Sequence, residues 1–124
     1  MAIKNLTATT TTYGRTAYVA LSSTNATAIV SNPAASSKCF RVTTLIASNV
    51  DGVNPCDITV SYYTQDDIGG TAYRVVSTTT IAPDSSLIVI DRDTIIYLEE
   101  DRSIGATASA ADDIEILCSY EEIS

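Results

Sequence analysis

The sequence predicts an all-β protein: a single antiparallel β-sandwich or jelly roll of about eight strands, with an extended N-terminal arm. β-branched residues dominate, because 41 of the 124 residues are Thr, Ile or Val. Such side chains fit a pleated sheet better than a helix. Apolar and polar residues alternate with a period of two in several short runs. Turn residues separate these runs at intervals of about ten residues, which is typical of sandwiches and jelly rolls.

Each expected strand is an alternating or apolar run between turn residues. The clearest is 57–64, where Ile58, Val60 and Tyr62 share one face and Tyr63 lies on the other. The run 87–90 does not alternate, which suits a strand covered on both faces or one at a subunit contact. In chain order, the expected strands are 15–21, 26–30, 40–47, 57–64, 71–77, 87–90, a short run from Ile95, 103–109 and 113–120. The turns between them lie at 32–33, 51–55, 66–70, 83–84, 91–93, 99–101 and 111–112.

The chain is expected to form one domain, since 124 residues fill a single core. Residues 1–12 are expected to form a flexible, Thr-rich arm, and residues 13–124 the β-sandwich domain. No apolar segment follows Lys4, so we expect no signal peptide, and no run approaches the length of a membrane span. The arm is either a frayed terminus or a segment that adds to a sheet edge of a neighbouring subunit. Its candidate partner-binding residues are Ile3, Lys4, Leu6, Thr9 and Thr11.

Charge is distributed unevenly along the chain. The whole net charge of −8 lies in residues 91–124. Without a basic stripe, binding to nucleic acid or to an anionic membrane is not expected. The acidic region is either a solvated surface or a docking site for a basic partner. Its candidate partner-binding residues are Glu99, Glu100, Asp101, Asp112 and Asp113.

The sequence offers little material for catalysis, and we expect no enzyme, no cofactor and no metal. Histidine is absent, which removes the commonest general base and metal ligand. The carboxylates cluster in expected turns and lack Trp platforms for a sugar cleft. A Ca²⁺ site at 91–93 or 112–113 is possible in principle, but ordinary turn capping is the favoured interpretation.

The three cysteines, Cys39, Cys56 and Cys118, do not have the spacing of a zinc site. Cys118 falls on the apolar face of its strand and is expected to be a small buried side chain. Cys39 and Cys56 could pair if their strands lie side by side. Reduced thiols in a chain assembled in a cytoplasm are the favoured interpretation.

Adjacent tyrosines at 62 and 63 point to opposite faces of one strand. One ring belongs in the core, and the other is left as an exposed aromatic side chain. Exposed aromatic residues suit protein interfaces. Tyr63 is therefore a further candidate partner-binding residue.

The C-terminal third carries a resemblance to a known class of protein. Its stretches are IAPDSSLIVI at 81–90, IYLEEDRSI at 96–104, ATASA at 106–110 and IEILCSYEEI at 114–123. Together they cover about 45 residues and resemble small virion structural proteins of tailed bacteriophages, of the marine and cyanobacterial phage type. Asp101-Arg102 stands where that pattern has a Gly-Asp turn.

The resemblance implies a β-sandwich that binds other virion proteins. The expected function is that of a capsid decoration (cement) protein, a homo-oligomer with a trimer favoured, bound to the major capsid protein in the virion. The first alternative is a neck, tail or fibre-associated virion protein. The second is a carbohydrate-binding attachment module, which the absence of Trp disfavours.

Overall fold

The structure is a computed structural model and describes residues 3–8 and 11–124. The described residues form one 3-10 turn and nine strands. In chain order these are η1 (Leu6–Ala8), β1 (Thr12–Ala20), β2 (Thr27–Asn32), β3 (Cys39–Asn49), β4 (Cys56–Tyr63), β5 (Ala72–Ile81), β6 (Ser86–Ile90), β7 (Ile96–Leu98), β8 (Arg102–Ala108) and β9 (Ile114–Ile123).

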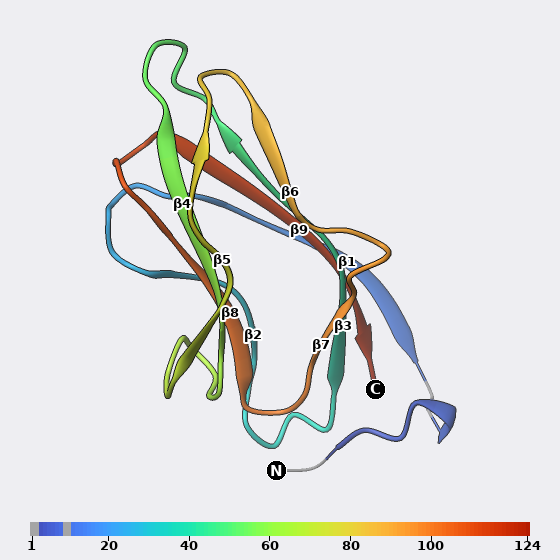
Figure 1. Cartoon of the computed structure of the whole chain (residues 1–124). Coiled ribbons are helices and arrows are strands. Elements are labelled where there is room, and N and C mark those ends of the chain that lie inside the picture. The colour runs from blue at the N-terminus through green and yellow to red at the C-terminus, as the bar shows by residue number, and fades with distance from the viewer. Residues whose placement is uncertain (1–2, 9–10) are drawn as a thin grey trace.

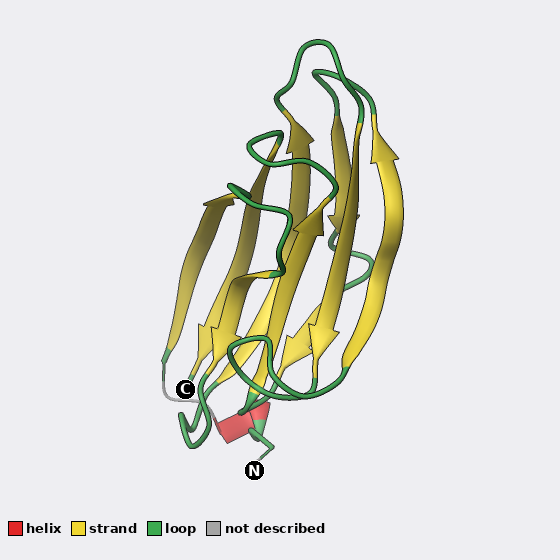
Figure 2. Cartoon of the chain, turned by 90° about the vertical axis from the view of Figure 1, so that its left-hand side faces the viewer, coloured by secondary structure: helices red, strands yellow, loops and turns green. Residues whose placement is uncertain are grey.

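The strands form two antiparallel sheets that face each other (Figures 1 and 2). Sheet A has the order β1-β9-β3-β6, and β7 pairs with β3 beside β6. Sheet B has the order β2-β8-β4-β5. Only β4–β5 and β6–β7 connect strands of the same sheet, and every other connection crosses between the sheets. This winding is that of a jelly roll, so the predicted all-β sandwich is confirmed.

The core lies between the sheets and is filled by the faces that the alternation predicts. In β4, Ile58 and Val60 are fully buried, and in β9 the same is true of Ile114, Ile116 and Cys118. Since side chains alternate across a strand, each of these residues leaves its neighbours in sequence facing outward. The packed core therefore fixes which residues remain available on the outer faces.

The structure contradicts one of the two interpretations of the run 87–90, namely that it is a strand covered on both faces. β6 is an edge strand of sheet A, and within it Leu87 and Val89 are partly buried while Ile88 is 62% exposed. The strand is thus not covered on both faces within this chain. The other interpretation, a subunit contact, stays a prediction.

Two buried asparagines connect the sheets. The Asn32 side-chain amide at the end of β2 donates to the carbonyl oxygens of Lys38 and of Leu98, the last residue of β7. Asn49 at the end of β3 donates in the same way to Asn54 and to Ile81, the last residue of β5. Because each amide bonds a carbonyl of the opposite sheet, the two side chains act as clamps.

The three cysteines are free and buried. The condition for a bond between Cys39 and Cys56 is not met, because β3 lies in sheet A and β4 in sheet B. Burial raises the pKa of the Cys118 thiol to about 12. Among the described residues, no helix is long and apolar enough to cross a membrane.

Candidate functional site

A row of large apolar side chains crosses the outward face of sheet A. Tyr18 of β1 lies opposite Leu117 of β9, Leu117 lies opposite Ile46 of β3, and Ile46 lies opposite Ile88 of β6. Tyr18 is 82% exposed, Leu117 53% and Ile88 62%, while Ile46 is partly buried. We call these four residues the apolar row.

The row arises from the same alternation that fills the core. Leu45 and Ala47 point inward and are buried, so Ile46 between them points outward. Ile116 and Cys118 do the same for Leu117. The neighbours of Tyr18 (Ala17 and Val19) and of Ile88 (Leu87 and Val89) are partly buried and pack against the same core, so all four side chains of the row are directed outward.

Small or charged residues flank the row along the strands. On one side Thr16 and Ser119 lie opposite each other, with their hydroxyl oxygens 3.1 Å apart. On the other side Ser48 and Ser86 are joined by a hydroxyl contact of 2.8 Å, next to Glu115. The row is thus an apolar band within an otherwise polar face.

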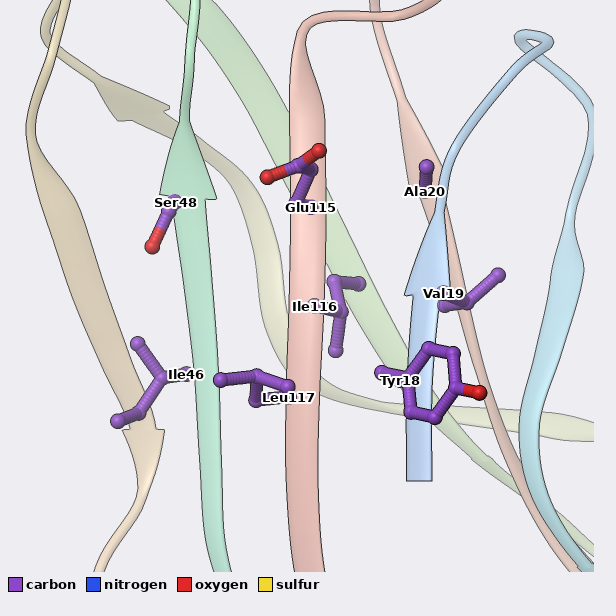
Figure 3. A pocket seen from close by; sticks show the side chains of 8 residues that line it. All are labelled: Tyr18, Val19, Ala20, Ile46, Ser48, Glu115, Ile116 and Leu117. Carbon is purple, nitrogen blue, oxygen red and sulfur yellow. The ribbon is translucent and has the colours of Figure 1, made fainter. Parts of the chain in front are cut away.

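The middle of the row borders a shallow hollow of about 400 Å³. Figure 3 shows Leu117 between Ile46 and Tyr18, with Ser48 and Glu115 nearer the ends of their strands. Single exposed apolar side chains are ordinary, whereas larger contiguous apolar patches are typical of interaction surfaces. The row is therefore the candidate site, and the chemistry that it offers is apolar contact.

The described part of the arm, residues 3–8, lies at the end of the sandwich where β1 begins (Figure 1). Ile3 and Leu6 are exposed and Lys4 is partly buried. Ile3 and Lys4 line a hollow of about 280 Å³ with Ser37 and Glu100.

The end of the arm continues the ladder of sheet A. Thr11 and Ser124 exchange both backbone hydrogen bonds, and β1 begins at Thr12. Thr9 lies outside the described residues. Partner contact by the arm, and a domain boundary between residues 12 and 13, stay predictions.

The structure places the two predicted acidic loops at opposite ends of β3. Residues 99–101 follow Leu98, which lies opposite Phe40 near the start of β3. Residues 112–113 precede Ile114, which lies opposite Asn49 at the end of β3. The two loops are therefore separate surfaces. They do not form one acidic patch that a single basic patch of a partner could contact.

Within the first acidic loop, two carboxylates hold the chain's own backbone. Glu100 is buried and accepts a hydrogen bond of 2.8 Å from the Ser37 amide. Asp101 accepts one of 3.0 Å from the Asp66 amide. Glu99 is partly buried. In the second loop Asp112 is exposed and Asp113 is partly buried, so Asp112 presents the most open carboxylate of the five candidates.

Part of the acidic excess is neutralised by bases from earlier in the chain. Glu122 of β9 is buried and contacts Lys38 and, at 2.5 Å, Arg15 of β1. Its hydrogen bond to Lys38, and then that to Arg15, lowers the pKa of the Glu122 carboxyl. Arg41 and Glu121 form a second pair at 3.6 Å. The charge count along the sequence thus overstates how anionic this region is.

Tyr63 is partly buried rather than open to solvent. Its ring carbon Cε2 lies 3.1 Å from the position that a Cβ at Gly105 would take. The most exposed tyrosines are Tyr18, Tyr73 and Tyr13, which sequence reasoning did not single out. The alternation over 15–21 was the available signal for Tyr18, since it places Ala17 and Val19 on the other face.

The described residues offer no metal centre. In residues 3–8 and 11–124, no group of three or more His, Cys, Asp or Glu side chains could hold a metal ion. The Asp91 carboxylate instead accepts hydrogen bonds from the Asp93 amide and the Thr94 hydroxyl. This is the turn capping that the sequence favoured at 91–93.

Comparisons with solved structures find chains that are similar to this one. A chain from the structure described as "Bacillus endospore appendages form a novel family of disulfide-linked pili" aligns with a TM-score of 0.55 and 15% identity, over 100% of this chain and 96% of that one. A chain from the acidic stable capsid of Helicobacter pylori bacteriophage KHP30 aligns with a TM-score of 0.49 and 11% identity, over 94% and 90%. No protein-family model matches the chain, and no curated protein matches it. At such identities, the first likeness concerns the fold alone.

Proposed function

We propose that the chain is a non-enzymatic structural protein of a bacteriophage virion, and that it acts as a capsid decoration protein on the major capsid lattice. The observation that carries the proposal is the apolar row across the outward face of sheet A. Exposure of these apolar side chains to water is unfavourable in free energy, and burial against a partner removes that cost.

The sequence resemblance and the row coincide in the fold. The stretches that resemble virion proteins form β6, β7, β8 and β9. Three of these strands belong to sheet A, and two of them supply Ile88 and Leu117 to the row. The part of the chain that suggests a virion protein is therefore also the part that builds much of the candidate contact.

The proposed mechanism is mechanical. Full burial of one large apolar side chain contributes about 1.5–3 kcal/mol, so the row supplies several kcal/mol against the cost of association. A protein that binds the assembled lattice, but not its separated subunits, stabilises the lattice by linkage. The arm and the exposed Asp112 are proposed as secondary contacts.

The test is binding to capsids, with variants matched for exposure. Leu117→Glu and Ile88→Glu each place a charge in the row. Tyr73→Glu is the control, because it places a charge at a similarly exposed position outside the row, on β5 of sheet B. We expect both row variants to lower the number of copies bound per capsid at least tenfold, because a buried unpaired charge costs several kcal/mol. The Tyr73 variant should bind like the wild type. Equal binding by all three variants would show that the row does not contact the capsid.

Deletion of residues 1–8 and the pair Asp112→Asn with Asp113→Asn test the secondary contacts in the same assay. If the deletion and the double substitution both leave binding unchanged, then the arm and the second acidic loop play no part.

Stoichiometry separates decoration from the alternatives. A decoration protein is present in tens to hundreds of copies per virion, whereas a neck, tail or fibre protein is present in a few to about a dozen. A subunit that builds its own fibre is the form that the pilus likeness suggests, and electron microscopy of the purified chain would reveal it. Selective retention on a glycan array would instead favour the carbohydrate-binding alternative.

A further inference from the structure

The four edges of the sandwich are not equivalent. Pairing of the edge strands β2, β5 and β6 with their neighbours is interrupted by register shifts. Pairing of β1 with β9 runs without a shift from Thr12 to Ala20. Figure 2 shows β1, the strand that follows the grey segment, at the margin of its sheet with no strand beyond it. Bulges and charges normally protect an edge from pairing, and β1 has no bulge and one charged residue, Arg15.

The hydrogen bonds at both ends of β1 show which backbone groups face the open edge. Thr11 exchanges two bonds with Ser124, and the Leu21 amide donates to Ile114. Bonded and non-bonded pairs alternate along an antiparallel ladder. The odd-numbered residues of β1 therefore bond to β9, and the even-numbered residues direct their N–H and C=O groups outward from the sheet edge.

We propose that β1 pairs antiparallel with β1 of a second copy of this chain, with Thr16 on the two-fold axis. The outward-directed groups belong to even residues, so even residues must lie opposite even residues. A register centred on Thr16 meets this condition and aligns the whole of Thr12–Ala20. A register centred on Arg15 would oppose two guanidinium groups, and one centred on Ala17 would leave Thr12 and Tyr13 unpaired.

The side chains fit this register. Tyr18 falls opposite Gly14 of the second copy, on the same outward face. Tyr18 is 82% exposed, and a Cβ at Gly14 would meet nothing within 4 Å, so the space over Gly14 is open. An aromatic ring over an edge glycine covers backbone that would otherwise be bare. Arg15 falls opposite Ala17, so no like charges meet.

The pairing joins two A sheets into one continuous sheet through about ten backbone hydrogen bonds. It uses the edge and, apart from Tyr18 and Gly14, leaves the outward faces of both copies open. This inference goes beyond the proposed function, since it concerns the dimer and not the capsid partner. A two-fold contact builds dimers, so a trimer would need a different surface. A dimer would also present two apolar rows, which raises avidity for a lattice.

The test is a charge exchange at Thr16, read by native mass from light scattering and by sedimentation. Thr16→Lys places two ammonium groups opposite each other, and Thr16→Glu two carboxylates. We expect a dimer for the wild type and a dimer weakened at least about fivefold for each variant alone. A mixture of the two variants should restore the dimer, because opposite charges then face each other. Thr44→Lys is the control, since Thr44 lies on the same outward face two strands from the edge.

Three results would overturn the proposal. The first is a wild-type chain that stays monomeric up to about 1 mM. The second is a dimer or larger species that Thr16→Lys does not weaken, or that Thr44→Lys weakens equally. The third is a mixture of the Lys and Glu variants that associates no better than either alone. Urea unfolding of each variant confirms that it is folded, and capsid binding is measured separately, so failure of the dimer and failure of the proposed function remain distinct.

Discussion

Ile68 packs directly over Gly105 on the outward face of sheet B. A Cβ at position 105 would lie 2.6 Å from Cγ2 of Ile68 and 3.0 Å from the carbonyl oxygen of Thr27. The loop that carries Ile68 is fastened there, because the Ile68 amide donates to the Ser103 hydroxyl at 2.8 Å and the Asp67 amide to the Ser31 hydroxyl at 2.9 Å. Ile68 itself has a φ of 52°, which is unfavourable for a β-branched residue and is maintained by these contacts.

Gly105→Ala is therefore expected to destabilise the fold. The new methyl group would have to displace a backbone carbonyl and a fastened loop, which is the overpacking case and costs about 2 kcal/mol. Gly14→Ala is the matched control when unfolding is measured on the monomer, because the space over Gly14 is open within one chain. It should then change the free energy of unfolding by no more than about 0.5 kcal/mol. Urea unfolding of both variants decides the matter. An equal response would show that Gly105 is not tightly enclosed.

Asn49→Ala should destabilise the sandwich by about 2–3 kcal/mol. The change leaves the buried carbonyl oxygen of Ile81, the carbonyl of Asn54 and the amide of Asp51 without this partner, and a buried group left unpaired costs more than the bond itself contributes. Asn25→Ala, at an exposed turn residue, should have little effect. Thermal and urea unfolding would contradict the clamp if the two variants behaved alike.

Stability should fall at acid pH in part through Glu122. Lys38 and Arg15 lower its pKa in the folded state, so its contribution is full above the ordinary carboxyl value of about 4.3 and is lost as pH falls through the folded value. Glu122→Gln removes this part, and its free energy of unfolding should therefore fall less than that of the wild type between about pH 5 and pH 3. The Asp51 carboxyl, whose pKa is lowered by hydrogen bonds from the Val53 and Asn54 amides, keeps some of the dependence. If the free energy of unfolding fell equally with pH in the variant and the wild type, the ion pairs of Glu122 with Lys38 and Arg15 would not contribute to stability.

The thiols should not react in the folded protein. Cys118 is fully buried with a pKa raised to about 12, and burial, with Glu99 nearby, also raises the pKa of Cys39. Since the thiolate is the reactive form, an aromatic disulfide reagent at about pH 8 should label neither residue until urea unfolds the chain. Rapid labelling of Cys118 in the native protein would show that β9 opens readily.

The sequence could predict which side chains are buried wherever this depends on the alternation within a single strand. Alternation placed Ile58 and Val60 inside, and likewise Ile114 and Ile116, because burial in a strand follows a period of two. The apolar row could not be predicted, since Tyr18, Ile46, Ile88 and Leu117 come from four strands whose register is set by tertiary pairing.

The roles of Asn32 and Glu100 could not be predicted either, because they too depend on partners that are distant in the sequence. Asn32 read as a turn residue, and its role depends on a carbonyl 66 positions away at Leu98. Glu100 read as part of a solvated acidic loop, but it is buried and accepts a hydrogen bond from the amide of Ser37, 63 positions away. Local patterns do not reveal such partners. The predicted site residues therefore came from the arm, the acidic loops and Tyr63, whereas the exposed apolar face lay elsewhere.

The proposed function requires that the outward face of sheet A attaches this chain to a capsid. The most direct measurement is the number of copies per particle in purified phage capsids mixed with the wild type or with Leu117→Glu, by quantitative mass spectrometry. We expect tens to hundreds of wild-type copies per particle and at least about tenfold fewer copies of the variant. Capsids that retain no wild-type chain, or that retain both proteins equally, would contradict it.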